Sequence, residues 1–181
     1  NKERIEREKS LIKEYGLKNK KELWKAEAIL RNFAKQAKRL IAEKTKQAKK
    51  EEIQLLKRLT ALGIIKASSV EDVLGITIKD ILERRLQSVV FKMGLAKTMK
   101  QARQFVTHEH IIVNDKKITS PGHLVLKEHE GKISFAPGSR LFSEEHPERV
   151  KKEGTQQKKP KESQTKKTKK KTKKKTMENK K

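Results

Sequence analysis

The first half of the chain has the hydrophobic period of amphipathic helices. Between residues 19 and 40, apolar side chains recur at alternating steps of three and four, which places them on one face of a helix. These positions are Leu23, Ala26, Leu30, Phe33, Ala37 and Leu40. Asn19, followed three residues later by Glu22, has the residue types of an N-terminal capping box. The pattern therefore predicts a helix of about 20 residues that begins at Asn19.

A second helix is predicted from an apolar face further along the chain. That face consists of Ile53, Leu56, Leu59 and Leu62. The helix should end at Gly63, because glycine readily takes the left-handed conformation that follows many helices. A short helical turn is predicted from Ser69 to Gly75, with Asp72 in the position of an N-terminal partner for Ser69.

Two more helices are predicted, one before Gly94 and one after it. Thr77 and Asp80 form a box that opens the first, which should run to Gly94. Its apolar face is Leu82, Leu86, Val89, Val90 and Met93. Thr98 and Gln101 form a second capping box, which opens a helix with the inner positions Ala102, Phe105 and Val106.

The pattern changes from helix to strand after residue 110. Short apolar or extended segments at 111–113, 117–118, 124–126 and 133–135 alternate with turns at Asn114-Asp115 and Pro121-Gly122. The predicted fold class is α+β, with a helical N-terminal region and a small module of two helices packed on a short, twisted antiparallel sheet. We assign residues 1–76 to the helical region, 77–140 to the module (core 81–126), and 141–181 to a C-terminal extension that is Lys-rich from residue 151.

Charge points to a polyanionic partner. The 181 residues include 48 Lys and Arg against 23 Asp and Glu, a net charge of +25, which favours nucleic acid as the partner. Only 33% of residues are hydrophobic, enough for one modest core and not for a large two-domain enzyme. The tail from residue 151 has no branched aliphatic side chain, so we expect it to be disordered when free. It serves either solubility and localisation or nonspecific phosphate contact.

The chain lacks the residue patterns of common catalytic and metal sites. It has no Cys, which excludes disulfides, thiolate zinc sites and a Cys nucleophile. No phosphate-binding loop, dinucleotide fingerprint or metalloprotease motif occurs, so we expect no catalytic residue and no cofactor. No apolar run is long enough to span a membrane, so we expect a soluble, intracellular protein with no membrane partner. His108 and His110 have a spacing that suits a metal, but no third ligand is evident; RNA contact and packing at a helix–strand junction are the alternatives.

Two groups of cations are candidates for phosphate binding. The first lies within about 20 residues around the helix that begins at Thr98, whose N-terminus favours an anion. Its members are Arg84, Arg85, Lys92, Lys97, Lys100 and Arg103, of which some are expected to be plain surface charges. The second is a stripe of Arg31, Lys35 and Lys38 on the outer face of the predicted helix 19–40. This stripe is either a solvated face or a phosphate-facing one, and the net charge favours phosphate.

A longer pattern resembles a known RNA-binding module. It combines Arg84-Arg85-Leu86, Gly94-Leu95-Ala96-Lys97-Thr98, Gln101-Ala102-Arg103-Gln104, His108-Glu109-His110-Ile111 and Val113-Asn114, with Pro121. At these spacings the chain resembles the module named after ribosomal protein S-four. Residues 14–24 and 82–87 are similar to the archaeal and eukaryotic branch of that family. The resemblance covers roughly residues 10–140 and leaves out the Lys-rich tail.

The resemblance implies a structural constituent of the small ribosomal subunit in the cytoplasm. Such a protein is a primary binder of the 5′ domain of the small-subunit rRNA, lies near the channel through which mRNA enters, and affects subunit assembly and translational accuracy. Its partners would be the rRNA, mRNA near that channel, and neighbouring proteins, notably ribosomal protein S-five, while residues 1–76 would brace RNA helices. The matching RNA-facing positions are Arg84, Arg85, Lys97, Thr98, Gln101, Arg103, Gln104, His108, His110 and Asn114, with Lys116 as a weaker candidate.

Two positions depart from the family pattern. Glu109 stands where the family commonly has Gly, which puts a carboxylate near the expected RNA. Asn114-Asp115 replaces Asn-Gly at the hairpin turn, and both residues tolerate positive φ, so the turn is still expected. The same module occurs in pseudouridine synthases and tyrosyl-tRNA synthetases, but those enzymes need a catalytic domain for which this chain has no room. A nucleolar factor of pre-rRNA processing and a free-standing stress or rescue binder are the remaining alternatives.

Overall fold

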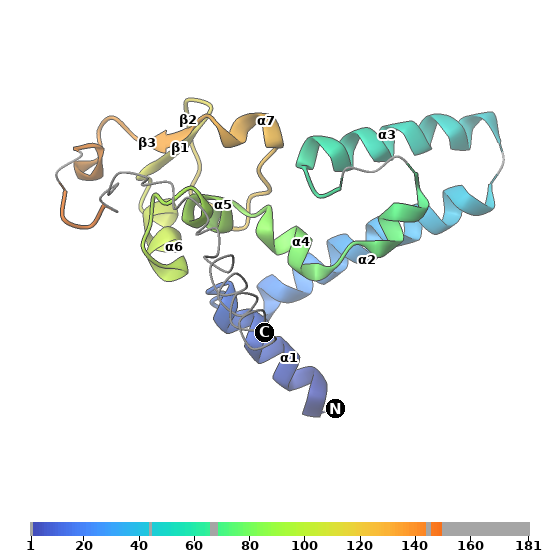
Figure 1. Cartoon of the computed structure of the whole chain (residues 1–181), viewed down its shortest axis with the longest axis horizontal. Helices are drawn as coiled ribbons and strands as arrows, with labels where there is room; N and C mark the ends of the chain where they lie inside the picture. The colour runs from blue at the N-terminus through green and yellow to red at the C-terminus, as the bar shows by residue number, and fades with distance from the viewer. Residues whose placement is uncertain (1, 44, 66–68, 144–145, 150–181) are drawn as a thin grey trace, which may run out of the picture. The chain divides into compact units, whose positions relative to one another are not determined.

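The computed structural model describes residues 2–43, 45–65, 69–143 and 146–149, so the predicted tail from residue 151 lies outside the described residues. The described residues belong to one compact unit. Its elements, in chain order, are α1 (Lys2–Glu14), α2 (Lys20–Ala42), α3 (Lys46–Leu62), η1 (Glu71–Gly75), α4 (Ile78–Glu83), α5 (Leu86–Lys92), α6 (Met99–Thr107), β1 (Ile111–Val113), β2 (Lys116–Lys117), α7 (Lys127–Glu130), β3 (Ile133–Phe135) and η2 (Arg140–Phe142) (Figure 1).

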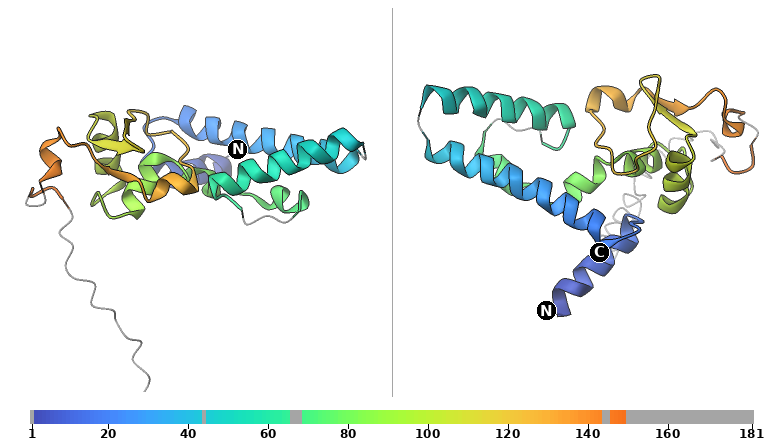
Figure 2. Two further views of the ribbon diagram at one scale, coloured as in Figure 1. Left: turned by 90° about the horizontal axis from the view of Figure 1, so that it is seen from above. Right: turned by 180° about the vertical axis from the view of Figure 1, so that it is seen from behind.

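Helix α2 is the centre of the N-terminal helical region. It contacts α1, α3, η1 and α4; α2 and α3 form a helical hairpin, and the segment carrying η1 and α4 returns along α2 (Figures 1 and 2). Its buried positions are Leu23, Ala26, Phe33, Ala37 and Leu40, which confirms the predicted face, with Leu30 only partly buried. Asn19 occupies the N-cap position as predicted, but its side chain makes no capping bond. Helix α1 had no specific sequence prediction.

Helix α3 ends where the sequence predicted and buries part of the predicted face. Gly63 has φ 67° and its N–H donates to carbonyls of the last turn, as expected of a left-handed helix end. The buried positions are Ala48, Leu55, Leu59 and Leu62, whereas Ile53 is 53% exposed and Leu56 only partly buried. Leu59 and Leu62 thus confirm half of the predicted face, whereas Ile53 and Leu56 do not, because the run 53–62 is apolar on more than one side and the contact with α2 selects among its residues.

The single helix predicted from Thr77 to Gly94 is wrong, because it is broken into α4 and α5 at Arg84 and Arg85. Val125 N–H donates to the Arg84 carbonyl oxygen (2.9 Å), and Leu86 N–H donates to the His123 carbonyl oxygen (2.7 Å). Arg85 and Leu124 form an isolated antiparallel bridge at this point. The chain thus exchanges helical hydrogen bonds for bonds to a distant segment. The extended segment predicted at 124–126 contributes this bridge and is not a strand of the sheet.

The C-terminal part of the unit is a small α/β module with its own core. Helices α5 and α6 pack together, and the three strands form an antiparallel sheet in the order β2-β1-β3. Ile112 pairs with Lys117 on one side and with Ser134 on the other. The core joins helices and sheet through Leu86, Val89, Val90, Ala102, Phe105, Val106, Ile111, Val113, Ile133 and Phe135. The predicted α+β class, with two helices on an antiparallel sheet, is confirmed, while the domain boundaries stay a prediction.

The turn between β1 and β2 has the predicted conformation. Asn114 and Asp115 have φ values of 50° and 62°, as a two-residue hairpin turn with positive φ at both positions requires. Asn and Asp tolerate this region better than most residues because their short side chains hydrogen-bond locally. The turn leaves Asn114 and Lys116 exposed beside the sheet.

Candidate nucleic-acid interface

The start of α6 presents polar and cationic groups to solvent. The Thr98 Oγ1 atom accepts from the backbone N–H of Gln101 (3.1 Å), and the Gln101 Oε1 atom accepts from the N–H of Lys97 (2.7 Å). The predicted cap of α6 by Thr98 is thus confirmed, although Gln101 reaches Lys97 rather than Thr98. Lys97, Thr98 and Lys100 are exposed. The positive end of the helix and the two ammonium groups add up to an anion-attracting surface.

A C-terminal segment lies against the same surface. The Lys97 ammonium donates to the Pro147 carbonyl oxygen (3.0 Å), and the Gln101 side-chain amide donates to the Glu148 carbonyl oxygen (3.2 Å). The guanidinium carbon of Arg149 lies over the Phe135 ring, 4.9 Å from the ring centre. Two of the predicted RNA-facing side chains therefore have a peptide partner, which sequence patterns did not indicate because residues 146–149 belong to no periodic element.

Arg85 and Arg103 meet at a carboxylate of α2. Glu22 accepts from Arg85 at 2.6 Å and from the two terminal nitrogens of Arg103 at 2.7 and 3.1 Å. The side chains of Arg85, Glu22 and Arg103 are 7%, 20% and 22% exposed. Burial alone would raise the pKa of Glu22, but the hydrogen bonds from Arg103 and Arg85 outweigh it and hold the pKa below its ordinary value. We call these three residues the Glu22 network.

The Glu22 network was missed by sequence reasoning. The sequence pattern presents Glu22 as a capping partner of Asn19, three residues away, whereas its side-chain partners lie 63 and 81 positions further along the chain. A partly buried carboxylate shared by two arginines ties α2 to the α4–α5 break and to α6. The sequence offers only a weak sign of this role, which is that Glu22 is one of two acidic residues in α2.

Arg84 makes a separate set of internal contacts. It donates to the Val125 carbonyl oxygen (3.0 Å) and to Glu130 of α7 (3.2 Å), and its side chain is mostly buried. Its Nε atom is buried without a hydrogen-bond partner among the described residues. The guanidinium therefore joins the break between α4 and α5 to the segment that carries α7.

The other predicted residues lie on two separate surfaces. Around α6 and the hairpin, the exposed ones are Lys97, Thr98, Lys100, Gln104, His108, Asn114 and Lys116, with Gln101 partly buried. Arg31, Lys35 and Lys38 are exposed on α2. Lys38 lies 16 residues beyond Glu22, or about 24 Å along the helix axis, because a helix rises about 1.5 Å per residue. The α2 stripe and the α6 surface thus form two candidate contacts rather than one patch.

The two histidines differ in their surroundings. His110 is partly buried, its Nδ1 atom lies 2.8 Å from the Ser139 hydroxyl, and its ring meets Phe105 edge-on. Burial, followed by the neighbouring His108, lowers the pKa of His110. His108 is exposed, with its ring centre 6.3 Å from that of His110. In the described part of the chain, no three His, Asp or Glu side chains are grouped as a metal site would need.

Glu109 holds a backbone conformation that favours glycine. Its φ is 61°, and its carboxylate lies 3.6 Å from the exposed Lys117 ammonium. The left-handed region costs a residue with a Cβ atom free energy, which explains why Gly suits this position. Glu109 thus combines a strained backbone with a negative charge next to the candidate RNA surface.

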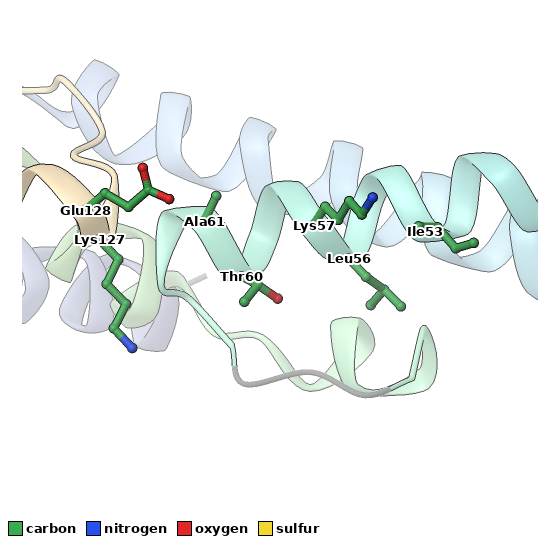
Figure 3. Close-up of a pocket in the computed structure, with 7 residues that line it drawn as sticks. All are labelled: Ile53, Leu56, Lys57, Thr60, Ala61, Lys127 and Glu128. Carbon is green, nitrogen blue, oxygen red and sulfur yellow. The ribbon is translucent and has the colours of Figure 1, made fainter.

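A hollow between α3 and α7 lies apart from these residues. It has a volume of about 680 Å³ and is lined by Ile53, Leu56, Lys57, Thr60, Ala61, Lys127 and Glu128 (Figure 3). Its walls are largely apolar, and none of the predicted RNA-facing residues belongs to it.

Comparisons with known proteins agree with a basic module of two helices on an antiparallel sheet. The family model of the S4 domain matches residues 84–130, which include the α4–α5 break, α6, the hairpin and α7. The small ribosomal subunit protein uS4 of Methanococcus aeolicus is 50% identical over 150 residues, covering 82% of this chain and 85% of the relative. The protein of the same name from Methanococcus maripaludis is 49% identical, covering 82% and 84%. The chain belongs to the uS4 family of ribosomal proteins, in its archaeal type.

Family membership confirms the resemblance drawn from the sequence. Both relatives are named small ribosomal subunit proteins, which agrees with the prediction that this chain is not an enzyme. Among the described helices, none is both long and apolar enough to cross a membrane.

Proposed function

We propose that this protein is a structural constituent of the small ribosomal subunit in the cytoplasm and a primary binder of the 5′ domain of the small-subunit rRNA. Membership of the uS4 family carries the proposal, and the net charge of +25 supports an RNA partner. In this proposal the protein lies near the channel through which mRNA enters, beside ribosomal protein S-five. It acts in subunit assembly and in translational accuracy.

The α6 surface is the proposed rRNA contact of the module. Lys97, Lys100 and Lys116 provide ammonium groups for phosphates, and Thr98 lies where the RNA backbone would meet the start of α6. Exposed polar side chains of Gln104, His108 and Asn114 extend this surface toward the hairpin. Gln101 and His110 are partly buried and are the remaining members of the proposed α6 contact.

The arginines of the module have a double role in this proposal. A guanidinium has five N–H groups, and the bonds of Arg103 to Glu22 use one on each terminal nitrogen. Arg103 therefore keeps donors for a phosphate at the edge of the network. Arg84 and Arg85 are less exposed and act mainly by holding the α4–α5 break and α6 in place for RNA.

The segment 146–149 competes with RNA for the start of α6. Its carbonyl oxygens accept hydrogen bonds from Lys97 and Gln101, the same donors that a phosphate would use. A phosphate is the stronger partner because its oxygens carry a full negative charge that attracts the Lys97 ammonium, whereas a peptide carbonyl oxygen is neutral. We expect rRNA to displace these two contacts.

Fractionation of cell extract on sucrose gradients at rising salt tests the proposed function. We expect the protein to stay with mature small subunits above about 0.5 M salt, because charge contacts buried within the assembled particle are screened less than exposed ones. Its presence only in precursor particles would instead support an assembly factor, and its presence only in the free pool would support a free-standing binder. Either result would contradict the proposal.

Salt titration of the purified protein with a 5′-domain rRNA fragment tests the mechanism of binding. If about ten phosphates are neutralised, log K should fall with log salt at a slope of about −7 to −9. A slope near zero would contradict a phosphate-dominated contact.

A further inference from the structure

Helix α2 carries an exposed tryptophan in line with its basic stripe. Trp24 is 46% exposed, and it is the single tryptophan of the chain. Counting along the helix, Trp24, Ala28, Arg31, Lys35 and Lys38 follow one another at steps of four, three, four and three. Residues at these steps share one face of a helix. This face lies opposite the buried one that begins at Leu23 and Ala26.

The charge along this face is almost entirely positive. Helix α2 contains two acidic residues. Glu22 is engaged with Arg85 and Arg103 on the other side of the helix. Glu27 lies about 60° around the helix from Trp24, at the edge of the stripe and partly buried. Lys20, one turn before Trp24, pairs with Glu8 at 3.1 Å, so the stripe proper consists of Trp24 and the three cations that follow it.

An exposed aromatic ring in line with cations is the arrangement that binds single-stranded nucleic acid. The cations attract the phosphate backbone, and a base stacks on the ring irrespective of its identity. Arg31 lies about 10 Å along the axis from Trp24 and Lys38 about 21 Å, so one short strand can reach all of them. The positive charge around the exposed ring favours an anionic partner.

We propose that Trp24 is a stacking site for an unpaired RNA base, next to a phosphate track formed by Arg31, Lys35 and Lys38. This inference rests on the proposed function, because it requires that the protein bind RNA. It goes beyond that function by naming a second contact, on the helical region, and its chemical class: an unpaired nucleotide rather than a duplex backbone. The site is separate from the α6 surface.

The fluorescence of the single tryptophan is a direct probe of this site. The full-length chain is titrated with the 5′-domain rRNA fragment, with a single-stranded RNA oligonucleotide and, as an anion without bases, with polyphosphate. Binding is measured separately by mobility shift. We expect both RNAs to quench the Trp24 emission and polyphosphate to bind without quenching, because polyphosphate occupies the cations and offers nothing to stack.

Matched variants separate stacking from charge and from fold. Trp24→Leu should weaken binding of the oligonucleotide by about 5- to 150-fold, whereas Trp24→Phe should keep most of the affinity. Ile41→Ala is the control, since Ile41 is 45% exposed on the same helix but off the stripe. Replacing Arg31, Lys35 and Lys38 with Gln should weaken RNA and polyphosphate alike. Circular dichroism checks that each variant is folded.

The outcomes distinguish this inference from the proposed function. If the rRNA fragment binds but leaves the emission unchanged, or if Trp24→Leu binds the oligonucleotide as tightly as the parent chain, the stacking site is refuted and the proposed function stands. Quenching by polyphosphate to the same extent as by RNA would refute it as well. If the rRNA fragment does not bind at all, the result contradicts the proposed function itself, on which the stacking site rests.

Discussion

Within the module around α5 and α6, the arginines and the lysines predicted to face RNA lie in two different environments. Arg85 and Arg103 share the Glu22 carboxylate at 2.6 to 3.1 Å, largely out of solvent. Lys97 and Lys100 lie exposed at the start of α6, a few residues away in sequence. The difference follows from the side chains: the planar guanidinium fork matches a carboxylate in a partly buried site, while the ammonium is strongly hydrated. Positive charge alone therefore does not identify a nucleic-acid contact.

The comparison also separates stability from affinity. A charge that is paired inside the fold contributes when the chain folds, whereas an exposed charge contributes when a partner arrives. The Glu22 network should thus govern the free energy of unfolding, and the exposed lysines should govern binding. The following substitutions test this division.

Substitution of Glu22 should have the largest effect. Glu22→Leu leaves Arg85 and Arg103 without their carboxylate, and removing one partner of a buried pair typically costs about 3 to 5 kcal/mol. Because Arg103 is partly exposed, we expect the low end of that range, about 3 kcal/mol, in urea unfolding followed by circular dichroism. Glu3→Gln is the control, since Glu3 pairs with Arg7 at 3.9 Å and both side chains are exposed, and its loss should be under about 1 kcal/mol. Equal losses in the two variants would contradict a special role for the network.

Neutralising Lys97 and Lys100 together should change affinity and not stability. Lys97→Gln with Lys100→Gln removes two phosphate contacts, so binding of the 5′-domain fragment should weaken by about 1 to 3 kcal/mol and the salt slope should fall by about 2 in magnitude. The double Lys→Arg variant keeps the charge and should bind nearly as well as the parent chain. A double Gln variant with unchanged affinity would remove the start of α6 from the RNA interface.

Acid should weaken the fold through Glu22. The pKa of Glu22 is lowered below its ordinary value of 4.5, so in the folded state this group holds its proton less tightly than in the unfolded chain. Its contribution to stability is complete above the unfolded pKa and is lost as the pH falls through the folded pKa. Urea unfolding between pH 7 and pH 3 should therefore show a decline below about pH 4.5 that is smaller in Glu22→Gln. Parallel declines in both proteins would assign the acid sensitivity to other carboxylates.

Restoring glycine at position 109 should have the smallest effect, with the opposite sign. Glu109→Gly relieves the cost of φ 61° for a residue with a Cβ atom, offset in part by the greater flexibility of the unfolded chain. We expect a gain of about 0.5 to 1 kcal/mol in unfolding free energy. Glu109→Ala removes the carboxylate but keeps the Cβ atom, so it should not reproduce the gain. If both variants are equally stabilised, charge rather than backbone conformation is the cause.

Local features could be predicted from the sequence because their partners are a few residues apart. The cap of α6 by Thr98, the end of α3 at Gly63 and the turn at Asn114-Asp115 all form as expected. Each depends on bonds within four residues or on the φ preference of a single residue type. The α+β class followed from the same local periods, and the family from the spacing of short motifs.

What the sequence by itself determined was thus the kind of elements, the family and the chemistry available for RNA. Only the tertiary structure decided which charged side chains are free to bind RNA. The break at Arg84-Arg85 depends on hydrogen bonds to residues 123–125. The buried position of Arg85 depends on its contact with Glu22, and the exposed Lys97 ammonium has a hydrogen bond to the Pro147 carbonyl oxygen. Each of these contacts joins residues about 40 or more positions apart, and no local period records such a pairing. A charge that looks free along the chain is therefore assigned to the fold or to a partner only when its neighbours in space are known.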